Sequence, residues 1–274
     1  MSSERGAIGA RLGLVLTAAA VLWGVTGAPM RAQGRQGAPP ETPPTPQAAS
    51  PIDLTGYWVS VITQDWRYRM VTPTKGDFAG LPLTPAAVEV ANHWDPAKDD
   101  AAGLACKSYG AGAILLRPGR LRFGWQDDRT LKLETDAGTQ TRVLRFGPAA
   151  GATAPSSWQG TSVAEWVTPP RPGGRQGRGG APGGAPAARS GSLKVVTTRM
   201  RAGYLRKNGV PYSEHAVLTE YFDIVAPPDA GRRLIVTIVI EDPMYLQQPY
   251  MGVAQFKAVA DGSGWDPTPC SSTW

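Results

Sequence analysis

The stretch RLRFGWQDDRTLKLETDAGTQTRVLRF, residues 120–146, indicates which fold class this chain adopts. Three short runs in it alternate apolar with polar residues, and turns rich in Asp and Gly separate them at 127–128 and 136–138. Alternation over short runs that are joined by such turns is typical of antiparallel hairpins. Consecutive hairpins without helices between them favour a barrel or a sandwich over a sheet built from βαβ units.

The rest of the chain contains further short runs that are rich in β-branched and aromatic residues. Together they predict a mainly β domain, either an antiparallel β-barrel or a strongly curved β-sheet. Gly56-x-Trp58 on the first expected strand resembles the start of lipocalin-type barrels, which implies a barrel of the calycin or lipocalin type. The further expected strands are Tyr57–Ile62, Leu193–Arg201, Ala216–Phe222, Leu234–Ile240 and Gly252–Val259.

Two short helices are expected to interrupt the β pattern. Thr84 stands directly before Pro85, and Asp95 directly before Pro96. A capping side chain followed by proline at the first helical position is a helix start signal. We expect both helices to lie over an end or a side of the β structure.

The N-terminal residues have the features of an export signal. Arg5 and Arg11 precede an apolar run at residues 12–28, whose length suits the hydrophobic region of a signal peptide. We predict a signal peptide at residues 1–32, with a retained N-terminal membrane anchor as the alternative. No second apolar run has that length, so the mature chain is expected to be periplasmic or secreted, without a membrane partner.

Two stretches are rich in Pro, Gly, Ala and Gln: one precedes the expected domain and the other lies within it. Residues 33–51 are predicted to be a disordered linker, and residues 169–191 a disordered loop, because neither stretch has enough apolar surface to order itself. The remainder has the length of one domain, so we expect a single β-domain at residues 52–274 that contains this loop.

The net charge of +6 does not lie in the expected folded part. Residues 169–191 carry four arginines and no acidic residue, and the leader adds a further positive excess. The rest of the chain is therefore close to neutral, and the sequence predicts no nucleic-acid partner.

The chain has two cysteines, Cys106 and Cys270. Export would place them in an oxidising environment, where disulfides form and persist. Cys270 lies in a Pro-rich tail that has little else to hold it, so we predict a disulfide between the two. Two separate free thiols are the alternative.

Sequence signatures of catalysis and of metal binding are absent. The chain has no G-x-S-x-G motif and no phosphate-binding loop. His93 and His215 are its two histidines, and they are too far apart in the chain to form a metal-binding pair motif. We expect no metal site and no cofactor, and the sequence leaves open whether the protein is an enzyme.

Charged residues on predicted inward faces are the first candidates for a site. Arg142 is in phase with Leu144, and Glu220 is in phase with Leu218. An Arg and a Glu that are buried in one β core must pair or contact a ligand, because a lone buried charge is too costly. The sequence permits both interpretations.

Further candidates come from strand ends and from the aromatic residues. Glu214 lies just before one expected strand and Asp242 just after the next, which could bring both acids to one mouth of a barrel. Trp58 and Trp125 lie on expected strands, as core residues or as residues that line an apolar cavity. Arg67 and Arg69 alternate with Trp66 and Tyr68, a pattern expected at a cavity rim or on a polar outer face.

A set of motifs between residues 158 and 249 resembles a group of uncharacterised exported bacterial proteins. The resemblance implies an exported β-domain and no particular activity. Tyr212 and Tyr221 stand where many members of that group have His and Arg, so a histidine-based site is not implied here. The matching motifs are WQGTS at 158–162, NGVPYSE at 208–214, EYF at 220–222 and IEDP at 240–243.

Three hypotheses about function follow. A barrel enzyme would use a carboxylate as general acid or base. A structural or interaction module would dock on a partner through residues 169–191. The hypothesis that we favour is an exported protein that binds a small, largely apolar or aromatic molecule in the barrel, with candidate contacts at Trp58, Trp125, Arg142, Glu214, Glu220 and Asp242.

Overall fold

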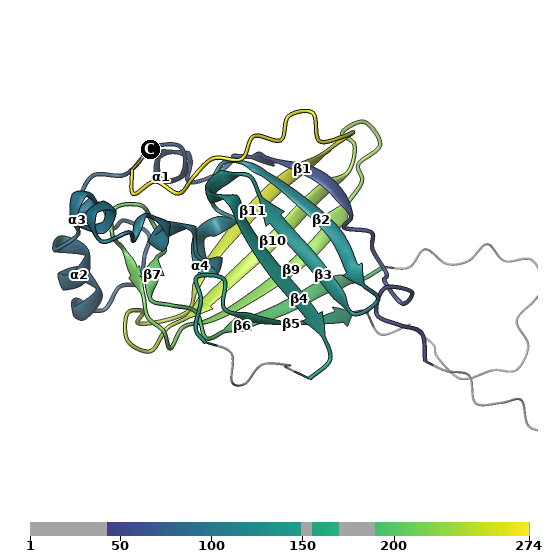
Figure 1. The fold of residues 1–274 in the computed structure, drawn as a ribbon, viewed down its shortest axis with the longest axis horizontal. Coiled ribbons are helices and arrows are strands. Elements are labelled where there is room, and N and C mark those ends of the chain that lie inside the picture. Colours follow the sequence, from purple (N-terminus) through teal and green to yellow (C-terminus); the bar gives the residue numbers. More distant parts are fainter. Residues whose placement is uncertain (1–42, 149–154, 170–189, 274) are drawn as a thin grey trace, which may run out of the picture. The chain divides into compact units, whose positions relative to one another are not determined.

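The computed structural model describes residues 43–148, 155–169 and 190–273. Nine strands in this part form a closed barrel in the order β1-β11-β10-β9-β6-β5-β4-β3-β2, with β2 paired back onto β1 (Figure 1). The predicted fold class is therefore confirmed. The strands are β1 (Gly56–Val61), β2 (Arg120–Asp127), β3 (Thr130–Thr135), β4 (Gln140–Phe146), β5 (Thr161–Val167), β6 (Ser192–Thr198), β9 (Val217–Val225), β10 (Arg233–Glu241) and β11 (Tyr250–Val259).

One pair of neighbouring strands departs from the predicted antiparallel pattern. β4 and β5 run parallel, with Leu144 beside Ser162 and Phe146 beside Ala164. Parallel neighbours cannot be joined by a tight turn, so the chain must return along the barrel before β5 begins. The hairpin signal that predicted β2, β3 and β4 correctly ends at this connection.

Apolar side chains fill the interior of the barrel. Inward-facing and outward-facing residues alternate along each strand, as barrel closure requires. Leu133, Leu144, Val195 and Leu218 have no accessible surface. A cavity large enough for water beside any of them would leave part of that side chain accessible, so the interior around these residues is a packed core.

One end of the barrel carries a cap of short helices and a small hairpin, on the left in Figure 1. A short 3₁₀ turn, η2 (Ala137–Thr139), joins β3 to β4 at the same end. The elements of the cap are α1 (Trp66–Arg69), α2 (Pro85–Asn92), α3 (Pro96–Ala101), the 3₁₀ helix η1 (Ala105–Tyr109), α4 (Ala111–Ile114), β7 (Gly203–Tyr204) and β8 (Pro211–Tyr212).

The two predicted helices are α2 and α3, and both begin as the sequence indicates. Thr84 Oγ1 accepts a hydrogen bond from the backbone of Ala87 (3.2 Å), and Asp95 Oδ1 accepts one from Ala97 (3.1 Å). The shorter helices α1 and α4 were not predicted, because four residues are too few to show helical periodicity.

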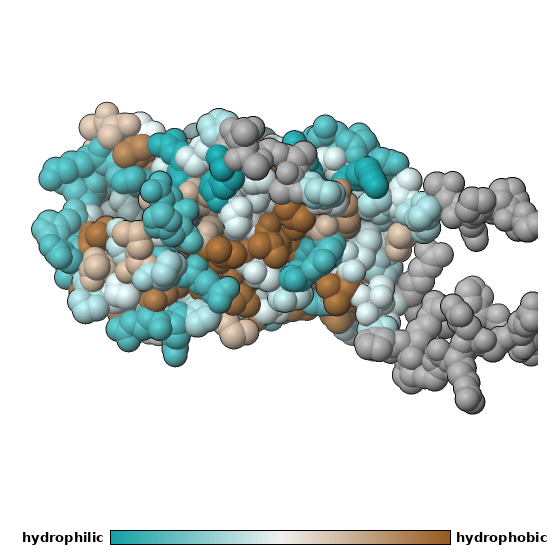
Figure 2. Space-filling view, turned by 90° about the horizontal axis from the view of Figure 1, so that it is seen from below, coloured by the Kyte–Doolittle hydropathy of each residue, from teal (hydrophilic) through white to brown (hydrophobic). Residues whose placement is uncertain are grey.

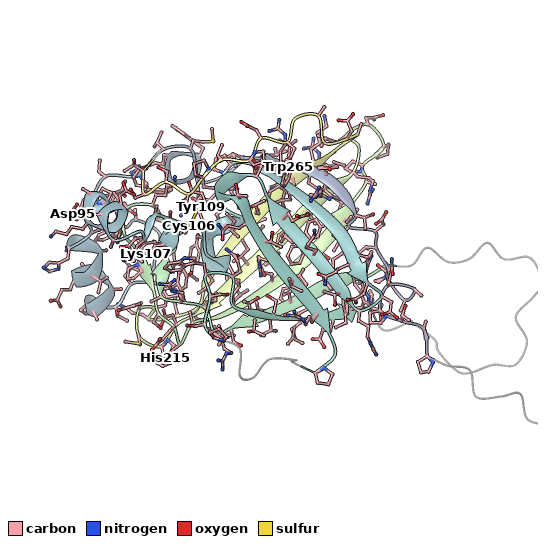
Figure 3. The ribbon with its side chains drawn as sticks, viewed as in Figure 1. Asp95, Cys106, Lys107, Tyr109, His215 and Trp265 are labelled. Carbon is pink, nitrogen blue, oxygen red and sulfur yellow. A yellow bond between two sulfur atoms is a disulfide. The ribbon has the colours of Figure 1, made fainter. Side chains whose placement is uncertain are left out.

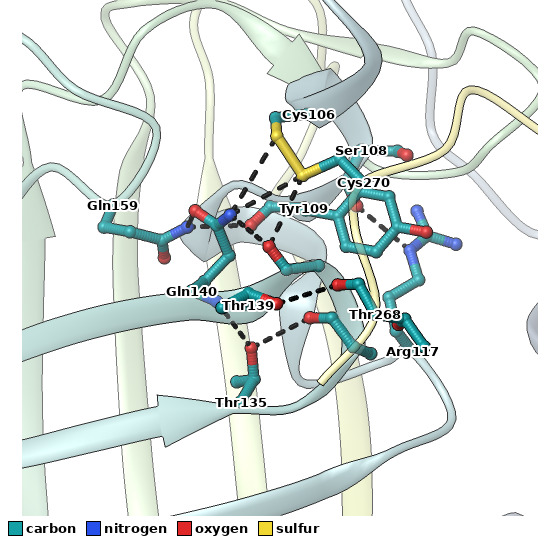
Figure 4. Close-up of a disulfide and its surroundings, with 12 residues drawn as sticks. Cys106, Ser108, Tyr109, Arg117, Thr135, Thr139, Gln140, Gln159, Thr268 and Cys270 are labelled. Atoms are coloured by element: carbon teal, nitrogen blue, oxygen red, sulfur yellow. Dashed lines mark hydrogen bonds between the residues drawn. A yellow bond between two sulfur atoms is a disulfide. The ribbon is translucent and has the colours of Figure 1, made fainter. Parts of the chain in front are cut away.

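The predicted disulfide is confirmed, and it ties the C-terminal tail to η1 of the cap (Figure 4). Thr139 Oγ1 donates to Thr268 O (2.9 Å), which holds the tail against the turn between β3 and β4. Figure 3 shows Cys106 next to Tyr109, between the helices and the barrel. A disulfide indicates a non-cytoplasmic environment.

The barrel end opposite the cap is covered by residues 43–51. Trp166 Nε1 donates to Pro46 O (2.8 Å), and Gln47 N donates to Asp128 O (3.1 Å). These nine residues, which belong to the stretch predicted to be a disordered linker, therefore contact the barrel through backbone groups. The predictions for residues 1–42 and 170–189, the signal peptide included, lie outside the described residues.

The hydropathy of the surface differs between the barrel strands and the capped end. On the face shown in Figure 2, apolar residues gather over the strands, whereas hydrophilic residues dominate at the capped end. No helix among the described residues is both long enough and apolar enough to cross a membrane.

Candidate functional site

Arg142 and Glu220 lie together inside the barrel and pair with each other. Arg142 Nη1 and Nη2 donate to the two carboxylate oxygens of Glu220 at 2.8 and 2.6 Å, and Nη2 also donates to Thr197 Oγ1 (3.1 Å). Ser162 Oγ lies 2.8 Å from the same threonine oxygen. Within this group of four side chains, Arg142 Nε is the buried polar atom that has no hydrogen-bond partner among the described residues. Of the two interpretations that the sequence permits, the geometry matches the internal ion pair.

The other two predicted acids lie outside this pair. Asp242 is buried and accepts hydrogen bonds from Ser213 N (2.6 Å), Ser213 Oγ (2.8 Å) and Met244 N (3.0 Å). These contacts shape the turn after β10. Glu214 is exposed. Neither carboxylate has a hydrogen bond or ion pair with Arg142 among the described residues. The structure therefore does not bring Glu214 and Asp242 into one site with Arg142 and Glu220.

The two predicted tryptophans are packing residues in different surroundings. Trp58 is 1% exposed, and its Nε1 donates to Leu54 O (2.9 Å). Trp125 stacks on Phe146 with ring centroids 5.6 Å apart, and Phe146 in turn contacts Trp166 at 5.2 Å. This aromatic row lies at the barrel end that residues 43–51 cover.

Three arginines converge on a small pocket between the cap and the barrel. Arg69 comes from α1, Arg117 follows α4, and Arg206 lies in the turn between β7 and β8. The pocket has a volume of about 20 Å³, which is room for one or two water molecules or for the end group of a ligand. Its lining residues are Asp65, Tyr68, Arg69, Leu116, Arg117, Leu205, Arg206 and Tyr250.

The three guanidinium groups are oriented by the protein, but their charges are not neutralised. Among the described residues, none of the three forms an ion pair, and Arg69 Nη2 is buried without a hydrogen-bond partner. Figure 4 shows one of the orienting contacts. Each guanidinium donates to a backbone carbonyl: Arg69 Nε to Leu116 O (2.8 Å), Arg117 Nε to Ser108 O (3.0 Å) and Arg206 Nη1 to Ala79 O (2.8 Å).

Burial and mutual repulsion weaken proton binding in this cluster. Burial, with a smaller contribution from the nearby charges of Arg69 and Arg206, lowers the pKa of Arg117 to about 10. Burial also lowers the pKa of Arg69 and of Arg206. Burial raises the pKa of Tyr250, which keeps its hydroxyl neutral. Asp65, the one carboxylate among the lining residues, is exposed, so the pocket carries a net positive charge.

The sequence pattern indicated one of these three arginines. It placed Arg69 at a possible cavity rim, and Arg69 does line the pocket, although on a helix and not on a strand. Arg117 and Arg206 were missed. The signal closest to them is the Lys207-Asn208-Gly209 turn, which begins directly after Arg206 and in which Gly209 has a φ of 83°.

No metal site is visible in the described part of the chain. No three side chains of His, Cys, Asp or Glu come close enough there to hold an ion. Figure 3 shows Asp95 and His215 on different parts of the capped end.

The fold defines a class of protein: a closed nine-stranded β-barrel with one end covered by a disulfide-tied cap. Comparison with known proteins finds no matching family model, no matching curated protein and no matching solved structure. The resemblance to exported bacterial proteins therefore stays a prediction.

Proposed function

We propose that this protein is a periplasmic or secreted binding protein that holds the anionic group of a small organic molecule in the pocket of Arg69, Arg117 and Arg206. One observation carries the proposal: three buried guanidinium groups converge there without an ion pair among the described residues. Buried charges are normally paired, since a lone buried charge is costly. A bound carboxylate, sulfate or phosphate group would supply the missing partner.

The chemistry of the lining supports this choice of ligand. Guanidinium groups present planar sets of donors that match carboxylate and phosphate oxygens. Leu116, Leu205, Tyr68 and Tyr250 add apolar surface around them, which suits the largely apolar ligand expected from the sequence. The proposal moves the site from the barrel interior to the end of the barrel, because side chains pack the interior around Arg142 and Glu220.

The enzyme hypothesis draws no support from the acids on which it depends. Glu220 is paired with Arg142, and Glu214 is exposed. Asp242 accepts hydrogen bonds from Ser213, which lies before β9, and from Met244 in the turn that follows β10. A general acid or base needs a perturbed carboxylate that faces a pocket. We therefore propose binding and no reaction.

Replacing Arg69 tests the proposed site directly. Isothermal titration of the oxidised protein with methyl sulfate should give saturable binding, and Arg69→Gln should weaken it by at least about tenfold, because a hydrogen bond to a charged group contributes about 1.5–3 kcal/mol. Arg67→Gln is the matched control, since Arg67 lies two residues away, is largely exposed and pairs with Asp77. Equal losses in both variants, or no binding by the wild type, would contradict the proposal.

The affinity should also depend on pH in a defined direction. Arg117 loses its proton as the pH rises through about 10, so binding of sulfate, whose charge is constant there, should weaken above that pH. Burial lowers the pKa of Lys207 to about 7, so this nearby amine is already neutral at about pH 8 and does not confuse the measurement. Titrations from about pH 8 to about pH 11 should show a flat region and then a decline that Arg117→Gln lacks. A profile unchanged by that substitution would show that Arg117 does not bind the anion.

A further inference from the structure

Large apolar side chains are exposed immediately beside the arginine pocket. Trp66 and Met251 are each 66% exposed, Val71 is 53% exposed and Met70 is 50% exposed. Single exposed apolar residues are ordinary, but several that gather beside a pocket indicate an interaction site. These four belong to the two chain segments that also supply pocket residues.

α1 with its flanking residues and the start of β11 each supply both pocket residues and exposed apolar side chains. Within α1, Arg69 turns inward, while Trp66 and Met70 are both exposed and lie one helical turn apart. In β11, Tyr250 lines the pocket and Met251 points outward, since neighbouring residues of a strand face opposite sides.

A hydrogen bond holds these two segments together. Gln64 Nε2, just before α1, donates to Val253 O of β11 at 2.7 Å. Asp65, directly before α1, lines the pocket and is exposed. Trp66 is the next residue in the chain.

We propose that the ligand is an anionic amphiphile, whose head group lies in the arginine pocket and whose alkyl chain lies on the apolar surface of Trp66, Met70, Val71 and Met251. This inference rests on the proposed function and names the class of molecule that the site takes. The pocket admits only an end group, so the rest of the molecule must lie outside it. The positive charge selects an anionic head, and the exposed side chains lose contact with water when a chain covers them.

Alkyl sulfates of different length separate the head group from the chain. Isothermal titration should show that hexyl sulfate, used as a monomer, binds roughly tenfold or more tightly than methyl sulfate, since each methylene removed from water contributes up to about 0.8 kcal/mol. The double variant Trp66→Ser/Met70→Ser should lose this gain and keep the wild-type affinity for methyl sulfate. Both replaced side chains are exposed, so the fold should tolerate the change.

Val225→Ser is the matched control, because Val225 is 45% exposed and ends β9 at the barrel end away from the cap. It should leave the gain from the longer chain unchanged. Equal affinities for the two sulfates, or a gain that survives in the double variant, would overturn the inference but leave the proposed function standing. Failure of both sulfates to bind would overturn the proposed function itself. Trp66-dependent binding to phosphatidylglycerol vesicles without a chain-length gain would also overturn the inference, in favour of a membrane surface.

Discussion

Glu220→Gln is expected to lower the free energy of unfolding by about 3–5 kcal/mol, because it leaves Arg142 as an unpaired buried charge. The side chains of the pair are 1% and 0% exposed, so water cannot replace the lost carboxylate. Gln has one acceptor oxygen where Glu220 has two, so its NH2 group would face one of the two Arg142 donors, and the amide carries no charge.

Urea unfolding measures this effect, and a surface pair supplies the control. Lys194 and Glu165 form an ion pair at 2.8 Å on neighbouring strands, with side chains 30% and 60% exposed. Glu165→Gln should cost less than about 1 kcal/mol. The double variant Arg142→Met/Glu220→Leu should recover most of the stability that Glu220→Gln loses, because replacing a whole buried pair by apolar residues is often neutral. If Glu220→Gln and Glu165→Gln cost the same, the pair inside the barrel is not as isolated from water as we describe.

Removing the disulfide should have an effect of similar size. Cys106 and Cys270 are 164 residues apart, and closing a loop of that length lowers the entropy of the unfolded chain by an amount worth about 5 kcal/mol in the chain-entropy model. We expect Cys106→Ser/Cys270→Ser to lose about 2–5 kcal/mol, the range observed when native disulfides are removed.

Reduction of the wild type provides an independent measurement of the same quantity. The reduced wild type and the double serine variant should unfold at the same urea concentration, and a reductant should not affect the variant. The tail around Thr268 should then exchange its amide protons faster, since its attachment to the turn between β3 and β4 would be weakened. Identical midpoints for the oxidised and reduced wild type would contradict the prediction.

The arginine pocket lowers the stability of the empty protein. Lowering the pKa of the buried Arg117 from its ordinary value to about 10 corresponds to about 3 kcal/mol at neutral pH. Between about pH 10 and the ordinary pKa of arginine, the unfolded chain binds more protons than the folded chain. In that range Arg117 therefore makes the free energy of unfolding rise with pH. Below about pH 10 the full cost is present. A bound anion would offset it, and the melting temperature should therefore rise on addition of ligand.

The sequence by itself determined the local features of this protein. Alternation and turn residues predicted the strands from β2 to β4, and Thr84 and Asp95 marked the starts of α2 and α3. Alternation also assigned Arg142 and Glu220 to inward faces, because the period of a strand decides which side of the sheet a residue occupies. All these features depend on residues that are close together in the chain.

Only the tertiary structure decided which distant residues meet. Arg142 and Glu220 are 78 residues apart, on β4 and β9, and the strand order β9-β6-β5-β4 brings them together inside the barrel. Arg69, Arg117 and Arg206 come from three separate segments of the cap, and no local pattern in the sequence relates them. Residues 43–51 have a composition typical of disorder, but the barrel end supplies hydrogen-bond partners that order them. Periodicity reports the local environment of a residue, whereas a site depends on how the chain returns to itself in three dimensions.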